Sequence, residues 1–469
     1  MSLLPVKTRQ GWRLLTDGAS GLQPNSAMTL RAVRLSLFVL VSVASWHCSR
    51  SGSSAPPPTL PDTTSALKTA IAAKSAAYVD QGERGRHAWQ EAQRFYKQNG
   101  YQLAWSDGTH PRGTLDGLIT AVRAADQDGL EPADYHLDEL DAARRGALDA
   151  DHAVALDLRA TYTYLRYATD LSVGTIDPED LNPEWHASPR TIYQRDALQT
   201  GLSGNNIGQS LIRLAPQSPQ YLGLKHQLAI ARQKQDAAAI EQIVMNMERW
   251  RWLPDDFGSR YLLVNIPAFR LDAIENGKSV LDMKVVTGKK ASPTPVLADR
   301  MTTVVFSPYW NIPQDIVQHE ILPKAAKDPA YLEKNHMEAD ANGNYRQLPG
   351  NGNSLGQVKF LFPNHFNVYL HDTPAQSLFD RIERDFSHGC VRLDEPLKLA
   401  QYVLRDQPEW TVEKIKAAME AGTERSVALK QPLPIYLVYF TAWENNGALE
   451  TVPDVYGIDR RHTATAGGQ

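Results

Sequence analysis

The chain has 469 residues, of which 42% are hydrophobic and 22% are charged. This length and composition allow a sizeable buried core, and we expect two folded domains. The formal net charge is −4, so the composition gives no sign of a protein that binds nucleic acid.

The N-terminal extension, residues 1–48, is predicted to hold a signal or anchor segment. Met28 is a candidate start residue, and the apolar run Leu35–Trp46 follows two arginines. Twelve residues are too few to span a bilayer comfortably, but they suit the core of a signal peptide. Three alternatives stay open: the signal is cleaved, it is retained as a short anchor, or Cys48 is modified with lipid. In each case we expect the body of the protein to be exported.

The next part of the chain is predicted to be a linker followed by a helical domain. Residues 49–65 are rich in Ser and Pro, which favours an extended segment that does not pack. Residues 66–238 carry apolar side chains at helical spacing. The clearest helical patterns cover residues 114–130, 153–171, 221–234 and 238–252. No group of residues here suggests chemistry, so we interpret this part as a scaffold domain.

Near Pro254 the hydrophobic period changes to short β-rich runs separated by Gly, Pro and Asn. These runs are residues 260–266, 280–288, 302–306, 357–362, 366–372 and 434–443. Between the third and the fourth lies a long insert, residues 307–356, with a helical patch near His319–Ala326. Connections of this length are usually functional and commonly act as lids.

The complete pattern predicts an α+β fold, with a helical N-terminal scaffold domain followed by a mainly β domain. The β domain is expected to cover residues 239–462, and residues 463–469 form a tail. Within it we expect one helix after Pro374 and another from Asp394, with a proline in the first turn of the second.

Cys390 is unusual because cysteines of exported proteins normally form pairs. If Cys48 is removed or lipidated, Cys390 is a reactive thiol, an intermolecular link or an inert buried side chain. A nucleophilic thiol needs a neighbouring imidazole, since its ordinary pKa is about 8.5. His388 is two residues away and His371 is nineteen residues upstream, and spacing leaves both open as the base. Gly389 permits a positive φ, which would aim consecutive N–H groups at an oxyanion.

A zinc-dependent peptidase is an alternative interpretation of the same residues. Its ligands would be His371, Asp372, His388 and Cys390. Their spacing lacks the usual CxxC or HExxH pattern, so the signal for a metal site is weak.

The motifs "HDTP" from His371 and "SHGCVRL" from Ser387 resemble the catalytic signature of L,D-transpeptidases with a YkuD-type domain. Further stretches, among them "MNMERWRWLP", "PYWNIPQDIV" and "LPIYLVYFTAW", are similar to the larger YcbB-like branch of Gram-negative periplasms. The resemblance covers residues 240–459, with a weaker match to the scaffold of that branch over Phe95–Gly108. It implies that residues 239–462 are an L,D-transpeptidase catalytic domain and that the insert is a cap over its site.

The resemblance also implies roles for single residues. Cys390 matches the nucleophile, and His371 matches the general base, oriented by the backbone carbonyl of Asp372. The segment His388–Cys390, with Gly389 at its centre, matches the backbone that forms the oxyanion hole. The position before this segment is Ser387.

Two further positions are implied to contact the substrate. Arg392 matches a position held by Arg in the family and could bind a carboxylate bidentately, although a surface salt bridge is the simpler interpretation. Tyr369 is expected to line the same wall.

The implied function is a peptidoglycan L,D-transpeptidase that makes 3→3 cross-links between stem peptides through a cysteine thioester, in the periplasm. The alternatives are L,D-carboxypeptidase activity, lipoprotein anchoring and a non-catalytic scaffold that binds the cell wall. No metal or organic cofactor is implied, and carbapenems are expected to acylate Cys390. The sequence leaves no room for the peptidoglycan-binding module usual in this branch. Binding to the wall would then come from the scaffold, the cap or a partner in cell-wall synthesis.

Overall fold

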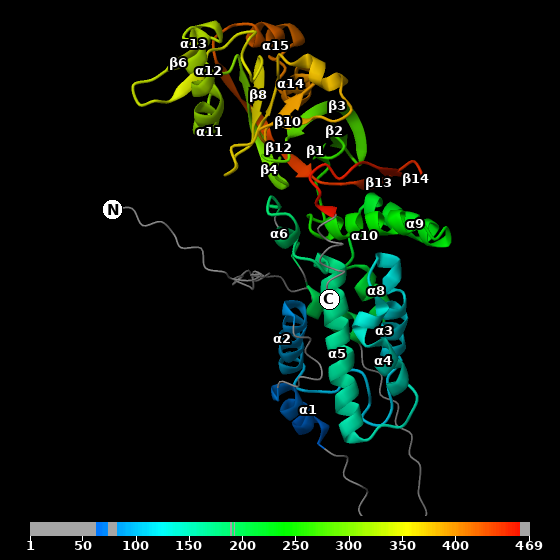
Figure 1. Ribbon diagram of the computed structural model, residues 1–469. Helices are drawn as coiled ribbons and strands as arrows, with labels where there is room; N and C mark the ends of the chain where they lie inside the picture. Colours follow the sequence, from blue (N-terminus) through cyan, green and yellow to red (C-terminus); the bar gives the residue numbers. More distant parts are fainter. Residues whose placement is uncertain (1–61, 74–81, 188–189, 192, 460–469) are drawn as a thin grey trace, which may run out of the picture.

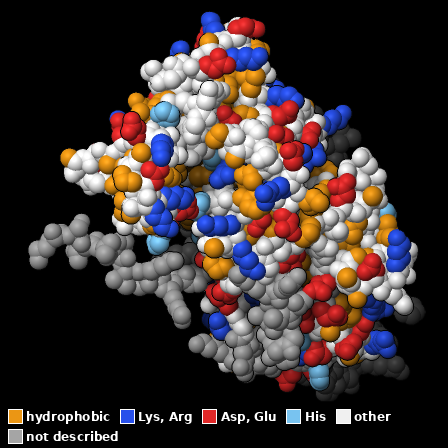
Figure 2. Space-filling view, turned by 45° about the horizontal axis from the view of Figure 1, so that its top comes forward, with side chains coloured by type: hydrophobic (Ala, Val, Ile, Leu, Met, Phe, Trp, Pro, Cys, Tyr) orange, Lys and Arg blue, Asp and Glu red, His pale blue; other side chains and the backbone are white. Residues whose placement is uncertain are grey.

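The computed structural model describes residues 62–73, 82–187, 190–191 and 193–459, which form a helical domain and a β domain (Figure 1). The predicted export segment, Cys48, most of the predicted linker and the tail lie outside these residues. Within the described part of the chain, no helix combines the length and apolar character needed to cross a membrane. Basic and acidic side chains are interspersed over the face shown in Figure 2.

The helical domain surrounds one long central helix, α5. The helices are α1 (Thr63–Ala72), α2 (Glu83–Gln98), α3 (Thr114–Arg123), α4 (Leu137–Ala143), α5 (Ala150–Val173), α6 (Pro178–Leu181), α7 (Gln194–Ser203), α8 (Ile207–Ile212), α9 (Pro219–Gln233) and α10 (Ala237–Arg251). Most side chains of α5 are buried on all sides, as expected of a helix inside a bundle. Asp149 caps its first turn, and it ends at Gly174, whose φ is +86°.

The four clearest helical patterns correspond to α3, α5, α9 and α10. The start of α1 differs from the sequence expectation. This helix begins at Thr63, inside the predicted linker, because the Asp62 side chain accepts a hydrogen bond from Ser65 N and caps it. A Ser/Thr-rich stretch of this kind can end in an N-cap, and composition alone does not separate the two.

The β domain contains a nine-stranded sheet of order β10-β3-β11-β9-β8-β4-β12-β1-β2, and a further β2–β3 pairing closes the sheet on itself. Its strands are β1 (Arg260–Asn265), β2 (Arg270–Glu275), β3 (Lys278–Gly288), β4 (Leu297–Phe306), β8 (Val358–Leu361), β9 (Leu370–His371), β10 (Asp385–Ser387), β11 (Val391–Leu393) and β12 (Arg425–Val438). Each of the six predicted runs contains a strand, whereas β2, β10 and β11 were not predicted. The hairpin β13 (Ala442–Asn445) and β14 (Ala448–Thr451) follows.

Two helices of the β domain are α14 (Pro396–Leu404) and α15 (Val412–Met419). The first is the helix predicted from Asp394. The helix predicted after Pro374 is wrong as an α-helix, because only a short 3-10 helix forms over Gln376–Asp380. Phe379 is buried there, but Ile382 is 91% exposed, so the apolar spacing does not define one buried face.

The insert is a small folded subdomain. It contains β5 (Trp310–Asn311), α11 (Gln314–Ile316), a π-helical turn (Val317–Ile321), α12 (Leu322–Lys327), α13 (Tyr331–Lys334), β6 (Met337–Ala339) and β7 (Tyr345–Gln347). The helical patch predicted near His319–Ala326 is therefore present. Ile312, Val317 and Ile321 form a core separate from that of the main domain. In Figure 1 the insert stands at the side of the sheet, above β4.

Helix α10 joins the two domains directly. It ends at Arg251, and β1 begins at Arg260, so no separate module lies between them. The side chain of Asn246 exchanges hydrogen bonds of 2.9 Å with the hydroxyl and the backbone N–H of Thr441. Trp250 stacks on Phe440 with ring centroids 4.8 Å apart. These contacts fix the scaffold against the β domain.

A second connection runs from the helical domain to the sheet. His186 N donates to the Val296 carbonyl at 2.7 Å, and Val296 N donates to the Glu184 carbonyl at 2.8 Å. The His186 ring also stacks on Phe366, with centroids 4.1 Å apart. The helical domain therefore touches two loops of the β domain that border the cysteine described below.

Candidate active site

Four predicted site residues share one face of the sheet. In the parallel pairing of β9 with β11, Val391 lies opposite Leu370 and Arg392 opposite His371. Side chains alternate along a strand, and Leu370, Val391 and Leu393 are completely buried in the core. The opposite face is therefore left to Tyr369, His371, Cys390 and Arg392. The rings of Tyr369 and His371 are in edge contact there, with centroids 5.8 Å apart.

Cys390 is a free, partly exposed cysteine at the start of β11. Its thiol donates a hydrogen bond to the Asn367 carbonyl, with an Sγ–O distance of 3.6 Å. Burial of the sulfur raises the pKa of Cys390 to about 11, while hydrogen bonds from Tyr369 and the charge of Arg392 oppose the rise. The resting cysteine is therefore a neutral thiol.

His371 is 4% exposed, and its Nδ1 lies 2.5 Å from the carbonyl oxygen of Asp372. A carbonyl oxygen only accepts, so Nδ1 carries the proton and Nε2 holds a lone pair. Burial, together with the charges of Arg392 and Lys359, lowers the pKa of His371 to about 3, although the hydrogen bond to Asp372 opposes the change. The imidazole is therefore neutral and can accept a proton at Nε2. This is the orientation by the Asp372 backbone that the resemblance implied.

The turn before Cys390 depends on Gly389, whose φ of +112° lies in a region that favours glycine. Ser387 is buried, and its hydroxyl donates to the Cys390 carbonyl at 2.5 Å and accepts from Gly389 N at 3.2 Å. Thr294 Oγ1 donates to the Gly389 carbonyl at 2.8 Å. Both sides of the turn are therefore fixed by hydroxyl groups.

These contacts change the expected oxyanion donors. The Gly389 N–H already donates to Ser387, whereas the Cys390 N–H has no acceptor among the described residues. The Cys390 N–H is therefore the donor that is open to a substrate oxygen.

His388 contacts the insert, and among the described residues it makes no hydrogen bond or ion pair with Cys390. Its Nε2 lies 2.7 Å from Glu320 Oε1 and 3.1 Å from Lys289 Nζ. His388 is only two residues from Cys390, but the positive φ of Gly389 interrupts the strand between them. The geometry therefore favours His371 as the base.

Arg392 has no ion-pair partner among the described residues, and its buried Nε has no hydrogen-bond acceptor there. Burial lowers the pKa of its guanidinium, and the nearby Cys390 raises it. The simpler interpretation of Arg392 as one half of a surface salt bridge is therefore not supported. A cation held beside the thiol without a partner can bind an anionic group.

The carboxylate of Asp372 has a structural task. It accepts from Gln357 N at 2.8 Å and from Thr373 N at 2.7 Å. Gly356 has a φ of +61°, and a Cβ there would lie 2.3 Å from this carboxylate. A glycine is therefore required where the chain leaves the insert.

Sequence reasoning missed three supporting residues: Asn367, Thr294 and Gly356. Asn367 adopts a positive φ of +55°, which Asn tolerates better than most residues. Its position two residues before Tyr369 was the available signal. Thr294 carries no local signal, because it lies far from the motif in the sequence.

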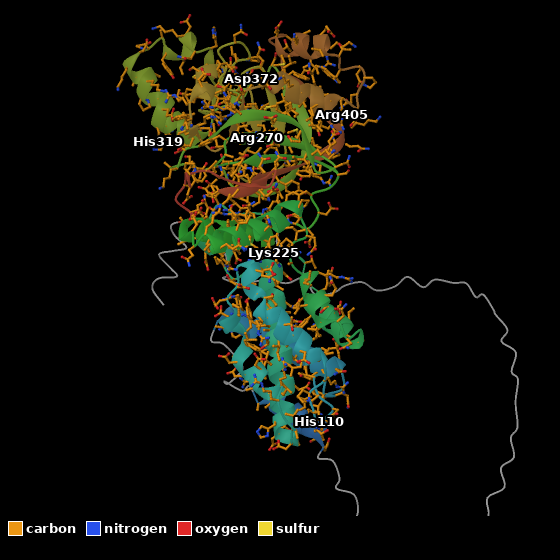
Figure 3. All side chains as sticks on the ribbon, turned by 90° about the vertical axis from the view of Figure 1, so that its right-hand side faces the viewer. His110, Lys225, Arg270, His319, Asp372 and Arg405 are labelled. Atoms are coloured by element: carbon orange, nitrogen blue, oxygen red, sulfur yellow. The ribbon has the colours of Figure 1, made fainter. Side chains whose placement is uncertain are left out.

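The zinc ligands considered from the sequence do not converge. Across the described ranges, no three or more His, Cys, Asp or Glu side chains gather closely enough to hold a metal ion. Asp372 and His388 are directed to other partners, as described above. Figure 3 labels Asp372 in the β domain, far from His110 at the opposite end of the helical domain.

Comparisons with known proteins agree with the division of the chain into a helical domain and a β domain. Residues 90–228 match a family model described as a scaffold domain, and residues 259–422 match one described as an L,D-transpeptidase catalytic domain. A curated Haemophilus influenzae protein named "Putative L,D-transpeptidase" is 33% identical over 240 residues, which cover 47% of this chain and 48% of that protein. The chain thus matches about half the length of that relative.

Two solved structures are distant neighbours. An L,D-transpeptidase from Mycobacterium smegmatis is 16% identical with a TM-score of 0.22, over 38% of this chain and 58% of that one. L,D-transpeptidase 3 from Mycobacterium tuberculosis, in complex with a faropenem-derived adduct, is 14% identical with a TM-score of 0.20, over 38% and 60%. From the family models, we conclude that residues 259–422 form a YkuD-type L,D-transpeptidase catalytic domain behind a helical scaffold domain.

Proposed function

We propose that this protein is a peptidoglycan L,D-transpeptidase that forms 3→3 cross-links between stem peptides through a thioester on Cys390. One observation carries the proposal. Cys390 and a neutral His371, with its Nε2 lone pair available, share one face of a domain that matches an L,D-transpeptidase catalytic domain.

In the first half-reaction, Cys390 Sγ attacks the carbonyl carbon on the L-centre of the third residue of a tetrapeptide donor. The thiol proton passes to His371 Nε2 as the C–S bond forms. The Cys390 N–H stabilises the oxyanion of the tetrahedral intermediate. The C–N bond then breaks, and His371 returns its proton to the departing amine of D-alanine.

In the second half-reaction, the side-chain amine of a neighbouring stem attacks the thioester carbonyl. His371 Nε2 accepts a proton from this amine, the C–S bond breaks, and the thiolate of Cys390 is protonated again. Water in place of the amine would make the enzyme an L,D-carboxypeptidase, and a lipoprotein amine would make it an anchoring enzyme. The insert supports cross-linking, because its contact with His388 places it beside the catalytic turn, where it can exclude water.

The pKa shifts of Cys390 and His371 support a mechanism in which the thiol loses its proton as it attacks. They do not favour a thiolate that is formed before the substrate binds. Burial raises the pKa of Cys390 and lowers that of His371, so both groups are neutral in the resting site. Moving the proton from sulfur to Nε2 creates two charges that burial disfavours. Arg392 offsets part of this cost, because its positive charge stabilises the sulfur anion.

The place of action and the membership of the YcbB-like branch are part of the same proposal. We propose that the protein acts in the periplasm after export by its N-terminal segment. The folded insert and the scaffold domain support the branch. A carbapenem should acylate Cys390, because its strained carbonyl and its carboxylate imitate the donor, and Arg392 is available to bind that carboxylate.

Product analysis tests the function directly. Purified protein is incubated with disaccharide-tetrapeptides, and the products are identified by mass spectrometry, with Cys390→Ser as the control. We expect dimers linked between two third residues, together with released D-alanine. Tripeptide without dimers would assign carboxypeptidase activity, and the absence of both products with folded, reduced protein would contradict the proposal.

A further inference from the structure

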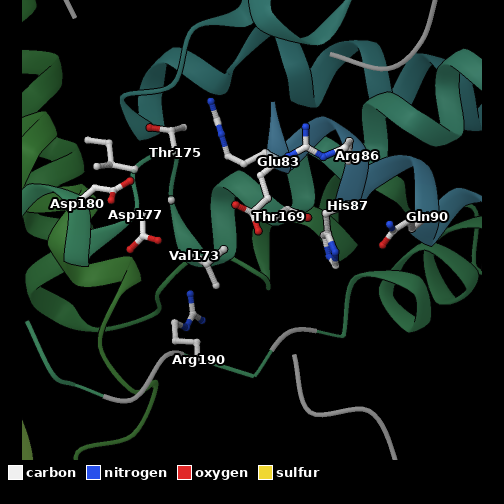
Figure 4. A pocket seen from close by; sticks show the side chains of 13 residues that line it. Glu83, Arg86, His87, Gln90, Thr169, Val173, Thr175, Asp177, Asp180 and Arg190 are labelled. Carbon is white, nitrogen blue, oxygen red and sulfur yellow. The ribbon is translucent and has the colours of Figure 1, made fainter. Parts of the chain in front are cut away.

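The helical domain contains a cavity of about 390 Å³ that the catalytic account does not use (Figure 4). Its walls come from the first turns of α2, the C-terminal end of α5, the segment that leads to α6, and Arg190. Thirteen residues line it: Glu83, Arg84, Arg86, His87, Gln90, Thr169, Val173, Gly174, Thr175, Ile176, Asp177, Asp180 and Arg190. This volume is sufficient for a short peptide.

Arg190 contributes a guanidinium to the wall of this scaffold cavity, where it shares its charge with Asp255. Its side chain is only 6% exposed, and Figure 4 shows its guanidinium directed toward Val173. Nη1 donates to the carbonyls of Ser172 at 2.7 Å and Leu214 at 3.2 Å, and Nη2 pairs with Asp255. The buried Nε has no acceptor among the described residues. Buried donors of this kind normally have a partner, so Nε indicates a missing acceptor.

The N-terminus of α2 adds positive potential to another part of the cavity wall. This helix has 16 residues, and its N-cap, Gly82, provides no side-chain hydrogen bond. Its first backbone N–H groups therefore receive no cap from the side chain of the N-cap residue, and a helix N-terminus favours an anionic group. Arg84, in the first turn, is also within the cavity wall, where it pairs with the buried Asp170 at 3.0 Å.

Acidic side chains line the cavity as well. Asp177 and Asp180 come from the segment around α6, and Glu83 lies at the start of α2. Burial raises the pKa of Asp177, and the charges of Asp180, Glu179 and Glu83 contribute to the rise. Such a cluster attracts a cation and would repel a ligand that carries only negative charge. The cavity therefore suits a ligand with both a carboxylate and an ammonium group.

The cavity is connected to the active site through a short stretch of chain. Arg190 lies four residues after His186, whose ring stacks on Phe366. Phe366 precedes Asn367, whose carbonyl accepts the hydrogen bond of the Cys390 thiol. In Figure 1, α6 lies between the helix bundle and the sheet. A ligand in the cavity would thus be held on the side of the scaffold next to the catalytic domain.

We propose that the scaffold cavity binds a peptidoglycan stem peptide through the amine and the carboxylate of its diamino-acid residue. This inference rests on the proposed function, because it assigns the cavity the same class of substrate. It also gives the chain a means to hold peptidoglycan without a separate binding module.

The test measures binding with the active site blocked. Wild-type protein is first acylated with meropenem, and isothermal titration calorimetry follows binding of two stem tripeptides. One ends in diaminopimelate, and the other ends in lysine, which lacks the side-chain carboxylate. We expect the diaminopimelate peptide to bind about tenfold more tightly, because only it engages both charged walls.

Two substitutions and one matched control locate the site. Asp180→Lys reverses an acidic charge of the wall, and Val173→Trp fills the cavity, so each should weaken binding of the diaminopimelate peptide about tenfold or more. Asp138→Lys makes the same charge change on α4, outside the cavity wall, and should retain wild-type affinity. Circular dichroism of all three variants verifies their folding.

The outcomes separate this inference from the proposed function. Meropenem acylation without binding of either peptide would overturn the cavity proposal alone. Equal affinity for the two peptides, or equal weakening by Asp180→Lys and Asp138→Lys, would overturn it as well. Failure of meropenem to acylate the folded protein would instead count against the proposed function, and peptide binding would then be compared among the unacylated variants.

Discussion

Asp157 in the scaffold and the cysteine site in the catalytic domain differ in how completely their polar groups are paired. In the scaffold, the carboxylate of Asp157 is completely buried and accepts from the backbone N–H groups of Ala104 and Trp105 at 2.8 and 3.0 Å and from Tyr96 OH at 2.9 Å. In the catalytic domain, Arg392 and the Cys390 N–H have no such partners within the described chain. Substitution of a buried group with a complete set of hydrogen-bond partners, such as Asp157, should reduce stability. Substitution of a group at the cysteine site, where partners are missing, should reduce activity.

The largest effect is expected at Cys390. Cys390→Ser should lower turnover at least about 10³-fold, because an imidazole suited to a thiol cannot deprotonate a hydroxyl of much higher pKa. The side chains are similar in size, so the circular dichroism spectrum and the melting temperature should equal those of wild type. A variant that keeps a tenth of wild-type cross-linking would exclude Cys390 as the nucleophile.

The next largest effect separates the two histidines. His371→Ala should reduce the rate roughly 10²–10⁴-fold through loss of the general base. His388→Ala is the matched control and should reduce it by less than about tenfold, because His388 contacts the insert. Rates are measured with the same disaccharide-tetrapeptides. The opposite order of the two effects would assign the base to His388.

Asp157 tests the stability side of the comparison. Asp157→Ala should lower the free energy of unfolding by about 3 kcal/mol, since it leaves buried donors without an acceptor. Asp149→Ala removes a 67% exposed N-cap from the same helix and should cost only about 1 kcal/mol. Denaturant unfolding gives both values. Both variants should still react with meropenem below their unfolding transitions, and loss of that reaction in the folded state would contradict the division of roles.

The pH dependence of thiol alkylation tests the resting state of the site. The pKa of Cys390 is raised to about 11, so its thiolate fraction should keep growing with pH up to about that value. The rate of iodoacetamide labelling of the Cys390 peptide should therefore still increase above pH 9, where a cysteine in a short control peptide levels off. A plateau near neutral pH would indicate a thiolate already formed beside an imidazolium.

The smallest effect concerns the contact between the insert and the catalytic turn. Glu320→Ala removes the partner of His388 and should raise the ratio of tripeptide to cross-linked product a few-fold, because water enters more easily. Glu338→Ala is the control, since this residue pairs with Arg346 inside the insert. An unchanged ratio in Glu320→Ala would show that this contact does not control access of water.

Much of this arrangement could be predicted from the sequence because it is local. The apolar spacing predicts α3, α5, α9 and α10, and the motif around Cys390 carries Gly389 and His388 next to the cysteine. His371 could not be preferred over His388 by spacing alone. The choice depends on the pairing of β9 with β11 and on the positive φ of Gly389.

The remaining features depend on contacts between distant parts of the chain. Thr294 holds the Gly389 carbonyl across 95 residues, and His186 reaches Phe366 from the other domain. The strands β10 and β11 have three residues each, too few to show a hydrophobic period. The scaffold cavity is formed by α2, α5 and the segment around Arg190, so no single stretch of sequence indicates it.

The most direct test of the central claim is the mass of the protein after reaction with meropenem. A positioned thiol with an oxyanion donor should open the β-lactam and keep it as a thioester. We predict the addition of one drug mass, located at Cys390 by peptide mapping and absent from Cys390→Ser. Folded, reduced wild-type protein that gains no mass, or that gains it at another residue, would contradict the assignment of Cys390 as the acyl-accepting nucleophile.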